Sequence, residues 1–218
     1  MLIAKWKKNN PLPHQDKPIP IQVIWCIAFV AQHLSPVPQG DFLHGVADMI
    51  IIAFFLLLWT GEYTNAPSNT THFTLKDVQL LCGPIRLDLR HTTLVTMLNQ
   101  ARFGTLTFAN QEKGVCGEVI GLRHNGDPYL CPIKAIICQE LHLQSHGAPI
   151  ITHLTRVFSQ GAIRTHSITP TTITKTLQEA VKFIGFDLGF LPSDVSARSQ
   201  RAAGGTALLL AKVDTDII

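Results

Sequence analysis

Apolar residues recur at helical spacing in several stretches of the chain, and each such stretch predicts a helix. The predicted helices cover residues 18–34, 42–59, 131–146 and 170–183, and a last one begins after Pro192. Pro132 suits the first turn of its helix, and Thr169 before Pro170 suits an N-terminal cap. Ser193 is the expected cap of the last helix, with Asp194 in its first turn.

Between the second and third of these helices the pattern changes to the alternation typical of strands. Residues 73–96 contain short extended pieces, and residues 103–109 and 115–122 are two strand-like runs separated by a polar segment. The two runs predict a β-hairpin in which Gly114 is available for a positive φ. With no parallel βαβ alternation, the order predicts one mainly α domain with a small antiparallel sheet, an α+β fold.

The domain is expected to cover residues 18–218, after a flexible tail over residues 1–17. Hydrophobic residues make up 46% of the chain and charged residues 15%, whereas about a quarter is charged in a typical soluble domain. A net charge of +3 is compatible with nucleic-acid binding without identifying it. The five cysteines form no Cys-x-x-Cys pair, and residues 1–10 lack the apolar core of a signal peptide, so a reduced intracellular location is expected.

The strongest apolar run, residues 49–59, has two interpretations. A membrane span needs about 20 apolar residues, whereas a run of roughly 10–14 is typical of a buried helix. Asp48 precedes the run and Glu62 follows it closely. We therefore expect a buried core helix and no membrane partner, with a membrane anchor as the weaker alternative.

Two small clusters are candidates for ligand binding. Cys138, His142 and His146 recur at every fourth residue, so they share one helix face that could place two ligands on a metal. Because no fourth ligand or supporting carboxylate is evident, no metal and no cofactor are predicted. The three lysines within residues 5–8, with one tryptophan among them, are typical of a solvated terminus.

Three features occur in an informative order. The apolar helix runs into Trp59 and Glu62, the hairpin carries Lys113 at its tip, and the last helix carries Arg198 and Arg201. In this order and spacing, residues 19–218 resemble the catalytic domain of tyrosine recombinases (phage-integrase-like enzymes), especially the divergent forms of eukaryotic mobile elements. The resemblance implies DNA recombination and integration as the setting, double-stranded DNA as the partner and the nucleus as a candidate compartment.

The resemblance also implies a chemistry for each residue type. In that family an apolar helix ends in Arg-x-x-Glu, a hairpin supplies a lysine, and a later helix carries His-x-x-Arg. The two arginines hold the phosphate oxygens by charge-assisted hydrogen bonds that strengthen in the transition state. The lysine protonates the leaving sugar oxygen, and a tyrosine that comes last forms the covalent DNA adduct.

The match to this sequence is partial. Arg201 matches the second arginine, Lys113 the hairpin lysine and Glu62 the glutamate, whereas Arg198 stands in place of the histidine. These four are the candidate catalytic residues, and Arg201, Arg198 and Lys113 are also the candidate DNA contacts. Trp59 stands where the first arginine belongs and supplies neither charge nor a bidentate fork.

The nucleophile segment would lie beyond Ile218, after a turn and helix start expected over residues 213–218. Neither Tyr63 nor Tyr129 stands in the nucleophile's place. We therefore expect a degenerate, C-terminally truncated relative, a pseudoenzyme that binds DNA without strand transfer.

Plainer interpretations stay open beside this one. Arg201 is equally expected as a buried arginine paired with Glu62 or an aspartate, and Lys113 as a solvated charge at a turn. Trp59 is most simply a core or rim side chain, and Glu62 can cap a turn. The alternative function is a non-enzymatic remnant or protein-interaction module whose exposed edge is covered by a partner or by self-association.

Overall fold

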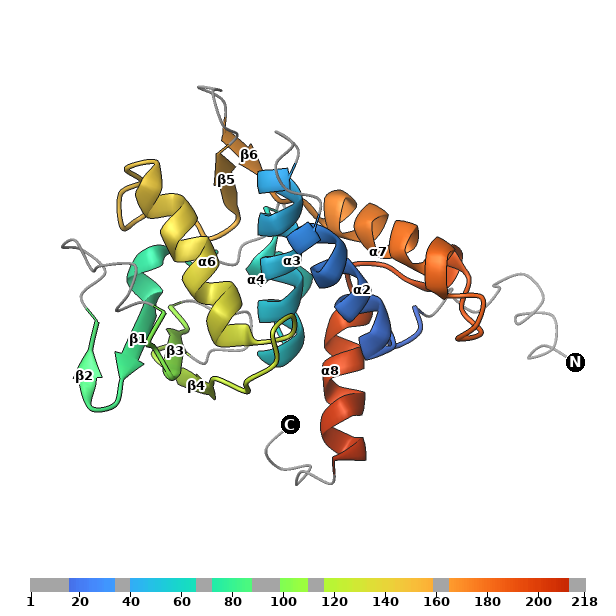
Figure 1. The fold of residues 1–218 in the computed structure, drawn as a ribbon, viewed down its shortest axis with the longest axis horizontal. Coiled ribbons are helices and arrows are strands. Elements are labelled where there is room, and N and C mark those ends of the chain that lie inside the picture. The colour runs from blue at the N-terminus through green and yellow to red at the C-terminus, as the bar shows by residue number, and fades with distance from the viewer. Residues whose placement is uncertain are drawn as a thin grey trace, which may run out of the picture.

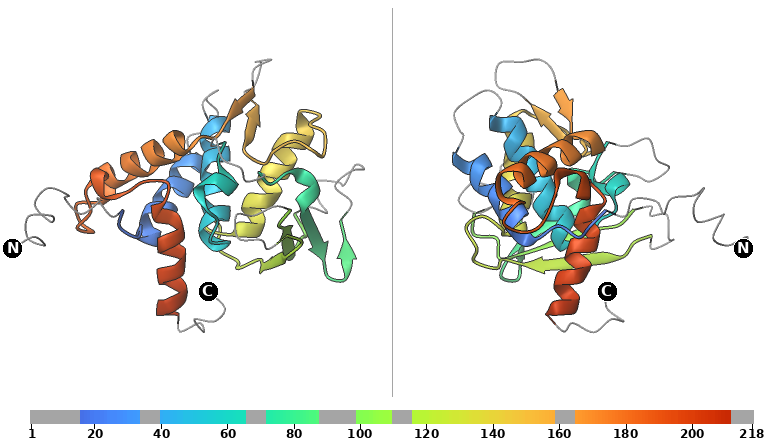
Figure 2. Two further views of the ribbon diagram at one scale, coloured as in Figure 1. Left: turned by 180° about the vertical axis from the view of Figure 1, so that it is seen from behind. Right: turned by 90° about the vertical axis from the view of Figure 1, so that its right-hand side faces the viewer.

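The computed structural model describes residues 16–33, 40–65, 72–87, 99–109, 116–158 and 165–211 (Figure 1). In this part the chain forms six α-helices, a four-stranded antiparallel sheet and a two-stranded sheet. Helix α3 lies between two groups of elements, with α6 and the larger sheet on one side and α2, α7 and α8 on the other (Figures 1 and 2). The predicted combination of helices with a small antiparallel sheet is confirmed.

The first two described helices form the centre of the core. α2 (Ile21–His33) packs on α3 (Gly40–Phe55), and every side chain of residues 49–54 is at most 5% exposed. Burial on all sides explains why this sequence is almost continuously apolar rather than periodic. The described helices include none with both the length and the apolarity to cross a bilayer.

Helix α3 ends earlier than predicted, at Phe55 rather than residue 59. The Leu58 N–H donates to the Ala53 carbonyl at 3.0 Å, and Leu57 has a φ of 53°. This is the hydrogen-bond pattern of a Schellman end, with leucine in the left-handed position that glycine usually occupies. The apolar run continues past the turn, so its periodicity did not reveal where the helix stops.

The larger sheet has the strand order β2-β1-β3-β4 and is antiparallel throughout. Its strands are β1 (Val78–Cys82), β2 (Ile85–Arg86), β3 (Phe103–Thr107) and β4 (Val119–Arg123), and the short 3-10 helix η1 (Leu75–Asp77) precedes them. Leu80 and Leu106 are buried on the face that meets Ile133 of α6. The predicted pairing of the two hairpin strands is confirmed, whereas its tip at residues 110–115 and the extended piece at 88–96 lie outside the described residues.

Helix α6 (Pro132–Ser145) begins where Pro132 predicted. It is followed by a two-stranded sheet, β5 (Arg156–Phe158) and β6 (Thr165–Ser167), which the sequence did not predict. Strands of three residues are too short to show alternation. Gln139 of α6 fixes this sheet, because its buried amide donates to the carbonyl oxygens of Leu154 and Arg156.

Helix α7 (Pro170–Ile184) confirms the predicted start and cap. The Thr169 hydroxyl accepts the Thr172 N–H at 3.2 Å, one of the N–H groups that a helix cannot satisfy within itself. α7 packs on α2 and completes the group of helices on that side of α3.

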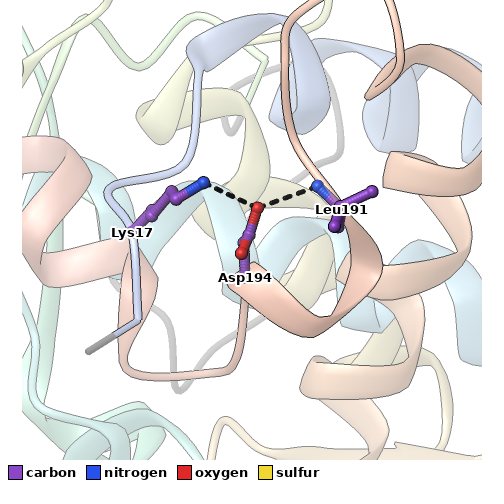
Figure 3. A network of polar contacts seen from close by, with 3 residues as sticks. All are labelled: Lys17, Leu191 and Asp194. Atoms are coloured by element: carbon purple, nitrogen blue, oxygen red, sulfur yellow. Dashed lines mark hydrogen bonds and ion pairs between the residues drawn. The ribbon is translucent and has the colours of Figure 1, made fainter. Parts of the chain in front are cut away.

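The last helix begins later than predicted. Residues after Leu191 form the 3-10 helix η2 (Pro192–Asp194), and α8 covers Ser199–Leu210. Ser193 is therefore not the cap. Asp194 closes the short turn instead, because its carboxylate accepts the Leu191 N–H at 2.9 Å (Figure 3).

The same carboxylate holds the start of the described chain. The ammonium of Lys17 lies 2.8 Å from Asp194 Oδ2 (Figure 3), and the Lys17 N–H donates to the Asp194 carbonyl at 2.8 Å. The Ser196 hydroxyl donates to the Asp16 carboxylate at 2.6 Å. The last two residues of the predicted tail are thus fixed on the segment before α8, and residues 1–15 lie outside the described part.

Candidate functional site

The candidate site lies where α8 crosses the end of α3. Gly204 of α8 is buried at the crossing, where a methyl group would lie 2.5 Å from both the Phe54 carbonyl oxygen and Leu57 Cδ2. No side chain larger than hydrogen fits at that distance without a shift of backbone. The crossing brings Arg201 to the turn that follows α3.

That turn leads into the short helix α4 (Thr60–Tyr63). The Glu62 carboxylate accepts the Trp59 N–H at 2.7 Å, and Glu62 is only 5% exposed. Glu62 therefore caps the turn, which was one of its two expected roles, and it also places a negative charge close to Arg201.

Arg201 stacks on Trp59. The Cζ atom of Arg201 lies 3.8 Å from the centroid of the Trp59 ring, a close cation–π contact. Partial burial lowers the pKa of Arg201 from its ordinary value, while the Glu62 carboxylate acts in the opposite direction. An arginine so shifted still carries its positive charge at neutral pH, so the site presents a cation, an aromatic ring and a carboxylate together.

Of the other two candidate cations, the structure describes Arg198 but not Lys113. Arg198 is exposed at the beginning of α8, three residues before Arg201, and its N–H donates to the Ser196 hydroxyl at 3.1 Å. Residues at this spacing are neighbours on a helix surface. Lys113 lies outside the described residues, so its approach to Arg201 stays a prediction.

Both tyrosines are engaged in contacts within the protein. Tyr63 is fully buried, and its hydroxyl donates to the Ala197 carbonyl at 2.8 Å. Burial raises the pKa of this hydroxyl, which makes it a poor nucleophile. Tyr129 packs against Trp25 and Phe29 with ring centroids 5.4 and 5.5 Å apart.

In the Cys138, His142 and His146 cluster, both histidines contact Phe158. The His142 Nε2 atom accepts the Phe158 N–H at 2.8 Å, and the His146 ring stacks on Phe158. That nitrogen's lone pair is therefore occupied in this arrangement. Within the described residues, no group of three or more His, Cys, Asp or Glu side chains could hold a metal ion.

Two residues near the site were missed by the sequence reasoning. The His72 Nδ1 atom lies 3.1 Å from the Gly61 carbonyl oxygen inside the α4 turn, and its ring lies 5.1 Å from that of His153. Gln200 is fully buried beside Arg201, and neither of its amide atoms has a hydrogen-bond partner among the described residues. No sequence pattern marks either residue, because both placements depend on tertiary packing.

No family model, curated protein or solved structure matches the chain.

Proposed function

We propose that this chain is a DNA-binding protein of the tyrosine-recombinase type that does not carry out strand transfer. The observation that carries the proposal is the meeting of Arg201 from α8 with Trp59 and Glu62 after α3. These residues are about 140 positions apart in the sequence, and the resemblance expects the corresponding positions of the family to share one phosphate site.

Phosphate binding suits the side chains at this site. A guanidinium can keep its flat face on an aromatic ring while the N–H groups on its edge donate to phosphate oxygens. Exposed Arg198 adds a second cation one turn earlier on the same helix. Together they form a small cationic site of the kind that contacts the DNA backbone without reading its sequence.

Strand transfer is not supported by the same residues. Two arginines are needed to hold the charge that develops on the phosphate, and Trp59 stands in place of one of them. Tyr63 is held inside the protein by its bond to Ala197, so it cannot reach a phosphodiester without local unfolding. Incubation with nicked duplex DNA is expected to leave no covalent protein–DNA adduct on a denaturing gel, and an adduct would contradict the proposed inactivity.

Binding is tested by removing the central cation. Arg201→Ala is expected to weaken the affinity for a fluorescently labelled duplex by roughly tenfold at low salt, because a charge-assisted phosphate contact is lost. Fluorescence anisotropy measures the change, and circular dichroism checks that the variant is folded. Lys175→Ala is the matched control, because it removes an exposed positive charge from α7.

Equal affinities of wild type and Arg201→Ala would contradict the proposal. A comparable loss in Lys175→Ala would also count against it, since binding would then depend on overall charge rather than on this site. Arg201→Lys keeps the charge but removes the planar fork, and it is expected to bind with an intermediate affinity.

The alternative function, a protein-interaction module, is favoured by the far end of α8. Leu209 is 53% and Leu210 is 79% exposed there, and this end of the helix extends beyond α2 and α3 (Figures 1 and 2). Exposed apolar side chains at the end of a helix offer a small surface for contact with another protein. In that case another protein or a second copy of this chain would bind the end of α8, and DNA would not be the partner.

A further inference from the structure

A pocket of about 280 Å³ opens between helices α2, α3 and α7. Its volume is close to the lower end of the range usual for small-molecule sites, about 300–1,000 Å³. It forms where α7 packs on α2 (Figure 1), because Cys26 of α2 and Ala180 of α7, which line it from the two helices, are small. None of its lining residues belongs to the Arg201 site.

The inner part of the pocket suits hydrocarbon. Ile27 is 4% and Ala180 is 7% exposed, so both lie deep between the helices. Burial raises the pKa of the Cys26 thiol, which is therefore uncharged at neutral pH. The Thr176 hydroxyl already donates to the Thr172 carbonyl at 3.0 Å. A polar group placed here would lose its hydrogen bonds to water, whereas an alkyl chain would gain by burial.

The mouth of the pocket carries a surplus of positive charge. Lys175 and Glu179 line it from the exposed surface of α7. Glu179 Oε1 lies 2.5 Å from Nζ of Lys182, so the charge of this carboxylate is balanced. Among the described residues, no acidic side chain forms an ion pair with Lys175. An anionic group at the mouth would therefore meet an ammonium whose charge nothing described here compensates.

We infer that this pocket binds a medium-chain carboxylic acid, with the alkyl chain between α2 and α7 and the carboxylate at Lys175. A chain of about eight carbons suits 280 Å³, because a methylene group occupies roughly the volume of a water molecule in the liquid, about 30 Å³. The inference does not depend on the proposed function, since it concerns other residues and another class of ligand.

Isothermal titration calorimetry with octanoate tests the inference. We expect saturable binding of octanoate and roughly tenfold weaker binding of hexanoate, because each buried methylene strengthens binding by about fourfold. Octanol has the same chain without the charge and is expected to bind about threefold more weakly than octanoate. Equal affinities for hexanoate and octanoate, or no saturable binding of octanoate up to the order of 1 mM, would overturn the inference.

Methyl NMR spectra of the wild type locate the bound chain. Octanoate is expected to shift the methyl signals of Ile27 and Leu43, which line the pocket. The signals of Leu80 and Leu106, which are buried beside the larger sheet, are expected to stay in place. Shifts at the sheet without shifts at the pocket would show that octanoate binds elsewhere and would overturn the inference.

Substitutions test the wall of the pocket. Ala180→Leu fills it from α7 and Cys26→Leu from α2, and each is expected to abolish octanoate binding. Ala202→Leu, at an exposed alanine of α8, is the matched control and is expected to bind normally. Circular dichroism checks that the variants fold. Unchanged affinity in a folded filling variant would overturn the inference, and if neither variant folds, the methyl shifts of the wild type decide.

A further substitution tests the mouth. Lys175→Ala is expected to weaken octanoate binding by about threefold and to leave octanol binding unchanged. Equal losses for the two ligands would show that the lysine does not hold the carboxylate. No amphiphile is present in the DNA titrations, so Lys175→Ala tests there only the loss of a surface charge.

Discussion

Among single residues, Arg201 and Trp59 show how one side chain changes what a site can bind. An arginine beside Arg201 would repel it unless a phosphate lay between them, whereas the Trp59 ring attracts it at 3.8 Å. The pair can therefore form without DNA. The contact with Trp59 holds Arg201 in a defined place.

Glu140 on α6 predicts a pH dependence of stability. It is 1% exposed, its Oε1 atom accepts from Gln144 at 2.7 Å, and its Oε2 atom has no hydrogen-bond partner among the described residues. Burial raises the pKa of this carboxyl from 4.5 to about 7, and the bond from Gln144 only partly opposes the shift. Between these values the folded state holds a proton that the unfolded state has released, so stability falls as pH rises through this window.

We therefore expect Glu140→Gln to be more stable than wild type at about pH 8, by on the order of 2 kcal/mol, and to differ little near pH 5. Denaturant unfolding at both pH values measures the difference. Glu179→Gln is the matched control, because that exposed glutamate pairs with Lys182 on the surface of α7 and should show little effect at either pH. A stability difference that is the same at both pH values would contradict the assignment.

The candidate site could be predicted from the sequence in part. Arg201 and Glu62 were singled out from the order in which three sequence features follow one another along the chain. The structure places the two residues close enough for the Glu62 charge to act on Arg201. The stacking of Arg201 on Trp59 could not be predicted, because no helical or strand period relates the two positions. The same holds for His72, which reaches Gly61 across a turn whose path is set by the rest of the fold.

At the scale of elements, the α3–α8 crossing depends on one glycine. Gly204→Ala is expected to lower the free energy of unfolding by about 1–3 kcal/mol, because the new methyl group would press on the Phe54 carbonyl. The neighbouring Gly205 has open space where its methyl group would lie. Gly205→Ala is therefore expected to raise stability by up to about 1 kcal/mol through helix propensity alone.

Denaturant unfolding compares the two alanine variants, which share a helix and a chemical change. Equal stabilities would mean that the helices do not cross as closely as described. A second readout is DNA affinity, which is expected to fall in Gly204→Ala and not in Gly205→Ala, because Arg201 is held over Trp59 by that crossing.

Element boundaries were predicted well where a local signal sets them and poorly where packing does. Thr169 and Pro132 fixed the starts of α7 and α6, since caps and first-turn prolines act within a few residues. The end of α3 at Phe55 and the late start of α8 were missed. The apolar run continues past the end of α3, so it did not mark the turn. The capping signal before α8 belongs to the 3-10 helix η2 instead.

At the scale of the whole molecule, the exposed leucines of α8 predict self-association. We expect light scattering to show a mass that rises with protein concentration up to the order of 100 μM, because adjacent apolar side chains at the end of α8 remain in water in the single chain. The double change Leu209→Lys/Leu210→Lys is expected to abolish the rise. Thr171→Lys, at an exposed polar side chain on α7, is the control.

A constant monomer mass for the wild type would remove the main support for the interaction-module alternative. A loss of association in Thr171→Lys as well would show that any added charge suffices. Either result leaves the DNA-binding proposal unchanged. Arg201, with Trp59 against it, lies near the beginning of α8, whereas the two leucines lie at its end.

The fold as a whole followed from the order of its elements. The helical runs, the hairpin and the absence of βαβ units predicted helices combined with a small antiparallel sheet. The structure has this combination, with the larger sheet on one side of α3 (Figure 1). The two-stranded sheet after α6 was not foreseen, because three residues carry too little pattern. Its position depends on the buried Gln139, whose partners are visible only in the folded chain.

The proposed contact of Arg201 and its neighbours with the DNA backbone predicts a salt-dependent affinity for duplex DNA. The logarithm of affinity is expected to fall linearly with the logarithm of salt concentration, with a slope of about −2 to −3 for the few cations proposed here. Arg201→Ala is expected to make the slope shallower by about one. An undetectable affinity at low salt, or an affinity that does not change with salt, would show that Arg201 does not bind the DNA backbone.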